Sequence, residues 1–115
     1  MGILKRKQPA TTTGHAGDDQ TLAALANVGA DLETPRLWEH FVYCEDEPGA
    51  AILETQAREA GWDASRFADD HHGIVASRTD RPVNPETVVA AREFFETLAS
   101  AVPGGDYDGW GAEGG

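Results

Sequence analysis

Carboxylates occur close together at two places in this chain, and a further one interrupts an apolar stretch. Asp69 and Asp70 are adjacent, Asp106 and Asp108 flank a tyrosine, and Glu39 stands among aromatic and aliphatic residues. Paired carboxylates can act as general acid and base in hydrolysis, or can hold Mg²⁺. Turns also ordinarily contain aspartate, and a chain with 20 acidic residues places some together by chance. We therefore expect no enzyme, and a hydrolase that uses Asp106 or Asp108 is the alternative.

The histidines and the cysteine lack the spacing of a metal site. His71 and His72 are adjacent, and adjacent side chains of a strand point to opposite faces, so this pair cannot readily chelate one ion. His40 and Cys44 share a face of an extended stretch but lie apart along it. No CxxC, HxxxH or HExxH pattern occurs, and the glycines do not form a phosphate-binding loop. The sequence therefore predicts neither a metal ion nor a cofactor.

The net charge limits the class of partner. The formal net charge is −11, and Lys5, Arg6 and Lys7 form the only basic cluster, so the chain from residue 8 onward carries −11 − 3 = −14. A surface of that sign repels a phosphate backbone, so we expect no direct binding of nucleic acid. A basic segment of another protein would instead be attracted by long-range electrostatic steering.

The chain shows no signal for a membrane or for export. No apolar run approaches the roughly 20 residues that cross a bilayer, and the first 19 residues lack the apolar core of a secretion signal. Cys44 is the only cysteine, which fits a reducing compartment. We therefore expect a cytoplasmic protein, and 115 residues suffice for one compact domain but not for two.

The hydrophobic period of each segment, together with its capping and turn residues, predicts the helices and strands that position these residues. Residues 1–16 have no hydrophobic period and are expected to be a disordered tail, with 112–115 as a flexible C-terminus. Asp18 or Asp19 is expected to cap a short helix that ends at Gly29. The expected order continues with a strand at 37–44, a helix within 45–61, two strands within 62–79 that meet at Asp69-Asp70, and a long helix within 84–103 capped by Asn84.

The strand expected at 37–44 is apolar on most of both faces. One face carries Leu37, Glu39, Phe41 and Tyr43, and the other carries Trp38, His40, Val42 and Cys44. We favour the first face as the one that meets the helices, and Glu39 would then need a partner such as Arg36 or an arginine of a neighbouring strand. The alternative is that Trp38 and His40 face the helices.

Residues 104–111, GGDYDGWG, combine a turn-like composition with two aromatic residues. Two strand–helix–strand units make a four-stranded antiparallel sheet with two helices on one face, and this stretch is the only one left to supply the last strand. Simple alternation would place Tyr107 and Gly109 on one face and Trp110 on the other, and Gly109 marks either a bulge or a close approach of another backbone. The predicted fold is therefore α+β and ferredoxin-like, preceded by a short N-terminal helix.

The two aromatic residues of this last strand have two explanations. They can pack on the end of the sheet, which we favour for at least one of them. They can also form a protein-binding patch with nearby acids, because an antiparallel sheet covered on one side leaves its other face to water or to a partner. The candidate partner-binding residues are Asp106, Tyr107, Asp108, Trp110, Asp69 and Asp70.

The sequence YDGWG, after a long helix and a glycine pair, resembles the C-terminal signature of the RraB family, regulators of ribonuclease E activity. GADLETPRLWEHFVYC resembles the start of that family's first strand, and EAGW is similar to its glycine–aromatic step. The resemblance covers roughly residues 18–111. It implies a ferredoxin-like domain over 17–111 that catalyses nothing itself.

The resemblance also implies the partner. Members of this family bind the endoribonuclease and inhibit or redirect its cleavage, and the implied contact is with the Arg-rich, non-catalytic scaffold of the enzyme. The acidic charge of this chain fits such a contact. The alternative is a small acidic adaptor that binds a different protein and has no link to a ribonuclease. The oligomeric state does not follow from the sequence.

Overall fold

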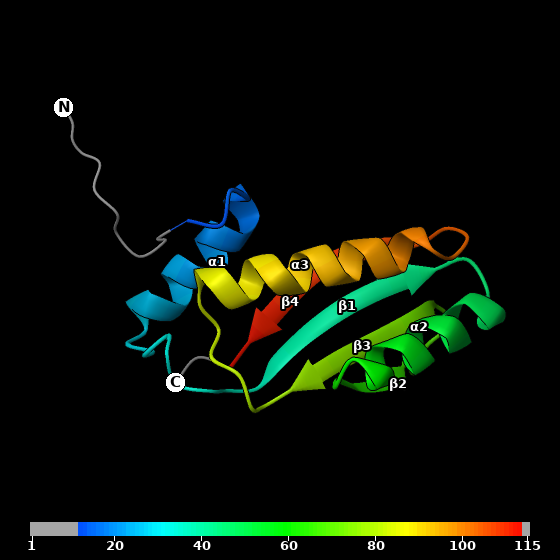
Figure 1. The fold of residues 1–115 in the computed structure, drawn as a ribbon, viewed down its shortest axis with the longest axis horizontal. Coiled ribbons are helices and arrows are strands. Elements are labelled where there is room, and N and C mark those ends of the chain that lie inside the picture. Colours follow the sequence, from blue (N-terminus) through cyan, green and yellow to red (C-terminus); the bar gives the residue numbers. More distant parts are fainter. Residues whose placement is uncertain (1–11, 114–115) are drawn as a thin grey trace.

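The computed structural model describes residues 12–113, which form three helices and one four-stranded sheet (Figure 1). The strands lie in the order β2-β3-β1-β4, and each neighbouring pair is antiparallel. The predicted α+β, ferredoxin-like fold with a helix before the sheet is confirmed. The elements are α1 (Ala16–Asn27), β1 (Trp38–Cys44), α2 (Glu47–Glu59), β2 (Asp63–Arg66), β3 (His72–Arg78), α3 (Pro85–Ser100) and β4 (Asp106–Ala112).

Both termini extend beyond the described part of the chain. Most of the tail predicted over residues 1–16 lies outside the described residues, and so does the end of the C-terminus predicted to be flexible over 112–115. Both expectations therefore stay predictions.

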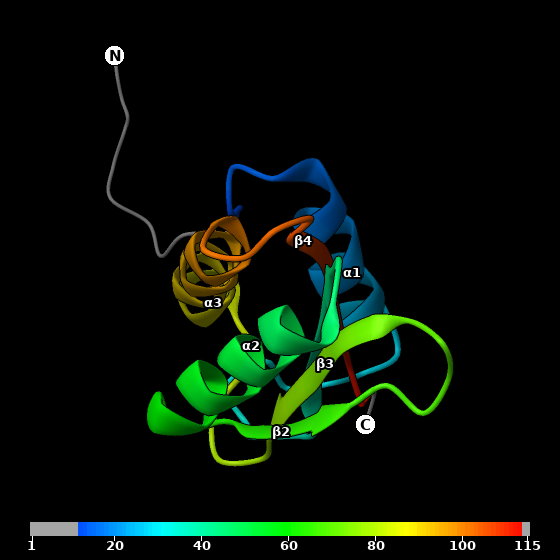
Figure 2. The same cartoon turned by 90° about the vertical axis from the view of Figure 1, so that its right-hand side faces the viewer.

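Helices α2 and α3 cover one face of the sheet. Figure 2 shows them on the same side, with α2 over β2 and β3, and the contacts place α3 against β1 and β4. Helix α1 packs beside α3 and β4 and contacts neither β1 nor β3. The core lies between the sheet and the two covering helices, and the opposite face of the central strands has no helix against it within residues 12–113. We call that second face the open face.

Helix α3 follows its sequence pattern closely. Asn84 accepts a hydrogen bond from the Thr87 backbone N–H at 3.0 Å, and the Thr87 hydroxyl accepts one from the Asn84 N–H at 3.0 Å. This reciprocal pair satisfies donors that the first turn would otherwise leave without a partner. Residues three and four apart then form the buried stripe, which comprises Val88, Ala91, Phe95 and Leu98.

Helix α1 begins earlier than expected and has a different cap. The Nδ1 atom of His15 accepts a hydrogen bond from the Asp18 backbone N–H at 3.1 Å. The prediction that Asp18 or Asp19 caps this helix is therefore wrong. The Asp18 carboxylate instead binds Arg92 of α3, and a side chain held in that ion pair is not available as a cap.

The face of β1 that meets the helices is the opposite of the favoured one. The residues of β1 buried on the helix side are Trp38, His40 and Val42. Leu37 is exposed, and Phe41 is only half-buried on the open face. The preference for Leu37, Phe41 and Tyr43 is wrong because both faces are apolar, so hydrophobicity could not rank them. Glu39 lies on the open face, where its carboxylate needs no arginine partner.

A bulge in β4 decides which of its side chains share a face. Trp110 pairs with His40 and Tyr107 pairs with Val42, so β4 has one more residue than β1 between these two pairs. Gly109 lies in this interval with a φ of +101°, and of its two sequence interpretations the bulge is correct. The extra residue resets the alternation of the strand. The prediction that Tyr107 and Trp110 point to opposite faces is therefore wrong, and both point to the helix side.

We expect Gly109→Ala to lower the free energy of unfolding by about 1–2 kcal/mol, because a residue with a Cβ is strained in the left-handed backbone region. Gly111 of the same strand is the matched control. A Cβ at either position would have nothing within 4 Å, and Gly111 does not have the positive φ. Gly111→Ala should therefore change stability by less than about 0.5 kcal/mol. Urea unfolding measures both, and equal losses would contradict the bulge.

Candidate partner-binding surface

Tyr107 of β4 is held against the core by a buried histidine. Its hydroxyl lies 2.7 Å from Nδ1 of His40, and its ring stacks on Phe95 with centroids 5.6 Å apart. Burial lowers the pKa of His40 to about 3, so the imidazole is neutral, and burial raises the pKa of Tyr107 well above its usual range. A neutral phenol and a neutral imidazole can share one hydrogen bond in a nearly dry core without a charge to compensate.

Trp110 is fixed by an ion pair between two helices. Its indole Nε1 donates to Oδ1 of Asp18 at 2.9 Å. The guanidinium of Arg92 donates to the same carboxylate through Nε at 2.6 Å and Nη2 at 2.8 Å. Arg92 also lies over the ring of Tyr107, 4.9 Å from its centroid. One arginine of α3 therefore joins α1 to both aromatic residues of β4.

The carboxyl group of Asp18 stays ionised in this buried position. Burial alone would raise the pKa of Asp18, but the hydrogen bonds from Arg92 and Trp110 outweigh it and hold the pKa below its usual value. The rings of Tyr107 and Trp110 thus hold β4 and α1 on the core, which is the packing explanation. The side chains of Asp106 and Asp108, between and beside them, are exposed.

The open face carries a pair of stacked rings that sequence reasoning did not single out. Tyr43 of β1 and Phe67, which follows β2, stack with centroids 4.6 Å apart and an interplanar angle of 18°. Gly73 of β3 makes room both for the backbone of β1 and for the rings, because a Cβ there would meet the carbonyl oxygen of Val42 first and would lie 2.8 Å from the Phe67 ring. The sequence feature that could have indicated this stack is a glycine in one strand paired with an aromatic residue in the adjacent strand, here Gly73 and Tyr43.

Two of the predicted acidic residues, Asp106 and Asp69, lie on opposite sides of Tyr43. Asp106 is the β4 partner of Tyr43, and on the other side of Tyr43 the ring of His71 makes an edge contact with it at 5.8 Å. Asp69 precedes His71 in the turn after β2 and accepts its backbone N–H at 2.9 Å. This hydrogen bond, followed by one from the His71 ring, lowers the pKa of Asp69 and keeps it charged.

We call this region the acidic end of the open face and define it by Tyr43, Phe67, Asp69 and Asp106. Asp70 is next to Asp69 in the turn after β2 and stays a predicted member from the sequence. Asp69, Asp70 and Asp106 are exposed, whereas the two rings are half-buried. Further along the same face, the strand register adds Glu39 and Asp63, and no described strand residue on it is lysine or arginine. Residues far apart in the sequence thus form one surface with rings at its centre and carboxylates around them.

The described residues, 12–113, contain neither a cluster of metal-ligating side chains nor a membrane-spanning helix. No group of three or more histidine, cysteine, aspartate or glutamate side chains is placed to hold a metal ion there. None of the three described helices has the length and apolar character that crossing a membrane requires.

A family model described as RraB, regulator of ribonuclease activity B, matches residues 15–112. The chain belongs to the RraB family. The match runs from the residue before α1 to the last residue of β4, so the family unit includes the N-terminal helix as well as the sheet. The resemblance expected from YDGWG is confirmed, and it identifies a regulator of ribonuclease activity. No curated protein matches the chain at a significant level.

Within this RraB-family fold, the residues of YDGWG divide between two roles. Tyr107 and Trp110 bind His40 and Asp18 inside the molecule, and Gly109 allows the bulge that turns both rings inward. Asp108 is left on the surface. The signature is therefore explained largely by the attachment of the last strand.

Proposed function

We propose that this RraB-family chain binds an endoribonuclease of the ribonuclease E type and inhibits or redirects its cleavage of RNA, without catalysing a reaction itself. The proposed contact is between the acidic end of the open face and an Arg-rich segment of the enzyme. The family match supports the regulation of a ribonuclease. The observation that supports this particular surface is the position of Asp106 and Asp69 on either side of the Tyr43–Phe67 stack.

An Arg-rich segment fits this surface by charge and by ring chemistry. A guanidinium group pairs with a carboxylate through two parallel hydrogen bonds and also stacks on aromatic rings. Asp106 and Asp69 supply the carboxylates, and Tyr43 and Phe67 supply the rings. The net charge of −11 steers a basic partner toward the molecule before contact.

The mechanism that we propose is competition for the basic segment. Arginines that pair with Asp69, Asp70 or Asp106 cannot bind RNA phosphates at the same time, because each guanidinium has one set of donors. Occupation of the segment then removes part of the enzyme's affinity for RNA, most of which comes from such phosphate contacts. Transcripts that depend on the segment would be spared, and others would still be cut.

Charge reversal at β4 tests this surface. The double variant Asp106→Lys/Asp108→Lys should bind an Arg-rich scaffold peptide of the host enzyme at least about tenfold more weakly at low salt. The difference should shrink as salt is added, because salt screens exposed charges. Titration calorimetry at two salt concentrations measures both effects.

The matched control is Glu59→Lys/Glu93→Lys, which makes the same change in net charge. Glu59 ends α2 and Glu93 lies on α3, both exposed and on the helix side of the molecule. This control should keep most of the affinity. If both double variants lose the same affinity for the peptide, net charge alone explains the loss and the proposed surface is wrong. Unchanged affinity in the β4 variant would also contradict the proposed surface.

A further inference from the structure

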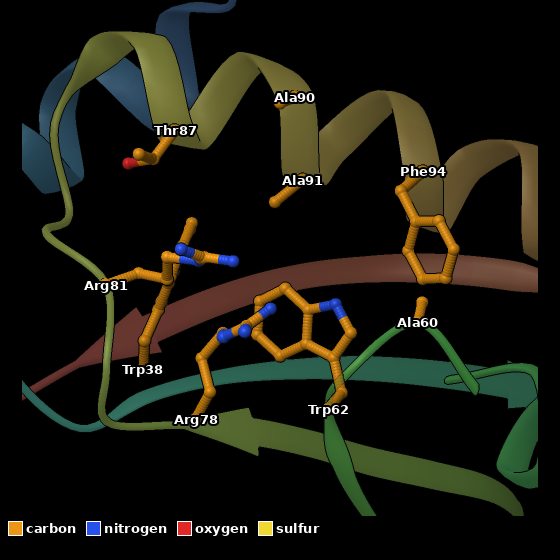
Figure 3. Close-up of a pocket in the computed structure, with 9 residues that line it drawn as sticks. All are labelled: Trp38, Ala60, Trp62, Arg78, Arg81, Thr87, Ala90, Ala91 and Phe94. Atoms are coloured by element: carbon orange, nitrogen blue, oxygen red, sulfur yellow. The ribbon is translucent and has the colours of Figure 1, made fainter. Parts of the chain in front are cut away.

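A cavity that differs chemically from the acidic end of the open face lies on the helix side of the sheet, under α3 (Figure 3). Its volume is about 230 Å³. None of its lining residues is acidic, although the chain has 20 acids. The side chains that give it its character are Trp38, Trp62, Phe94, Arg78, Arg81 and Thr87.

The aromatic walls are fixed by the core. Trp38 is 2% exposed and Trp62 is 8% exposed, and their rings meet edge to face with centroids 5.5 Å apart. Phe95 holds Trp62 from behind in a second edge contact at 5.0 Å. The indole Nε1 of Trp38 is buried and has no hydrogen-bond partner within the described residues. The packed rings therefore form a preformed wall, and the Trp38 donor lies beneath that wall and not on the cavity surface.

Arg78 and Arg81 both line this cavity, and Asp80 is the only acidic residue between them in the sequence. Arg78 lies over the ring of Trp62 at 4.7 Å and has a side chain only 13% exposed. Its Nε and Nη2 donate to Asp80, whereas Nη1 has no partner among residues 12–113. Arg81 makes no hydrogen bond or ion pair with the described residues, and it lines the cavity together with Trp38 (Figure 3). The cavity therefore contains one guanidinium, that of Arg81, without a carboxylate partner among the described residues, although the protein as a whole is acidic.

We propose that this cavity binds a small carboxylate carried on a single flat apolar ring. Its volume is below the roughly 300–1,000 Å³ of pockets for drug-sized ligands, so one ring is the body that fits. The ring lies among Trp38, Trp62 and Phe94, and its carboxylate pairs with the guanidinium of Arg81. Arg78 contributes only its Nη1, because its Nε and Nη2 are bound to Asp80. The first turn of α3, which contains Thr87, adds partial positive charge on the same side. This site is on the opposite face from the proposed ribonuclease contact and does not depend on it.

Benzoate is the probe for this proposal, and the three tryptophan indole N–H signals in an NMR spectrum are the readout. Titration should shift the signals of Trp38 and Trp62 in a saturable way. The signal of Trp110, whose N–H is bound to Asp18 outside the cavity, should move less. Benzyl alcohol, which lacks the charge, and inorganic phosphate, which lacks the ring, should each bind at least about tenfold more weakly.

Arg81→Gln should weaken benzoate binding at least about tenfold, because it removes the guanidinium that has no partner among the described residues. Arg58→Gln is the control, since Arg58 is an exposed arginine of α2 that does not line the cavity. Both positions are exposed, so both variants should fold, which a melting curve verifies. Shifts that do not saturate, equal binding of benzyl alcohol, or wild-type affinity in Arg81→Gln would each overturn the proposal.

Discussion

Replacement of Asp18 by alanine is expected to lower the free energy of unfolding by about 3–5 kcal/mol. The carboxylate of Asp18 is 4% exposed and accepts from Arg92 twice and from Trp110 once. Its removal leaves the indole N–H of Trp110 and the Nε and Nη2 donors of a largely buried Arg92 without their acceptor, and burial without a partner is the costly case. Only Nη1 of Arg92 keeps a carboxylate partner, Glu96. It also removes the polar contacts that join α1 to α3 and β4, while Leu22 and Leu25 still hold α1 on the core. Chemical denaturation with a tryptophan fluorescence readout measures the loss.

Glu96→Ala provides the control for this prediction, because Glu96 binds the same arginine from the surface. Its carboxylate lies 2.8 Å from Nη1 of Arg92 and is 56% exposed. An exposed pair of this kind contributes at most about 1 kcal/mol. A loss in Asp18→Ala no larger than that in Glu96→Ala would contradict the structural role assigned to the Asp18–Arg92–Trp110 group.

Acidification from about pH 6.5 to about pH 3 is expected to cost about 4–5 kcal/mol of stability through His40 alone. Burial lowers the pKa of His40 in the folded protein from 6.5 to about 3. Below pH 6.5 the unfolded chain binds a proton at this residue and the folded chain does not, so unfolding is favoured as the pH falls. The contribution of the neutral histidine is fully present above pH 6.5 and is lost progressively on the way to pH 3.

The slope of the free energy of unfolding against pH distinguishes the contribution of His40 from that of the carboxylates. One proton corresponds to about 1.4 kcal/mol per pH unit, and between about pH 6 and 4.5 ordinary carboxylates are still largely ionised. His40→Phe should remove most of this slope, whatever its effect on stability at neutral pH. His72→Gln, at an exposed histidine, should keep it. A wild-type slope that persists in His40→Phe would show that His40 is not the titrating group.

Local signals were sufficient for the helices and for the order of elements. Asn84, Pro85 and the spacing of Val88, Ala91 and Phe95 define α3 without any tertiary information, because caps and a 3.6-residue period are properties of the segment itself. The fourth strand followed by elimination once the first unit was recognised. The core contacts of Tyr107 and Trp110 explain why two aromatic residues lie in a stretch of turn-like composition.

The faces of the edge and central strands could not be predicted in the same way. In β1 both faces are apolar, and only the packing of Trp38 and His40 against α3 and Trp62 decides between them. In β4 one extra residue at Gly109 reverses the alternation of side chains after it. A prediction that assumes strict alternation between the two faces cannot detect such a bulge.

The candidate surface was predicted in part. Asp69, Asp70 and Asp106 were singled out, and the structure brings Asp106 and the Asp69 turn to opposite sides of one ring. That ring, Tyr43, had been assigned to the helix side, so its stack with Phe67 was missed. A contact between residues on two strands depends on register, which a single sequence does not specify.

The most direct test of the proposed function is RNA cleavage by the host's ribonuclease E in forms with and without its Arg-rich scaffold. Wild-type protein should slow cleavage of a structured RNA only when the scaffold is present, and Asp106→Lys/Asp108→Lys should lose most of that effect. Glu59→Lys/Glu93→Lys should retain it. Inhibition that is independent of the scaffold would contradict the proposed contact with the Arg-rich segment. No binding to either form of the enzyme would contradict the proposed function and indicate a different protein partner.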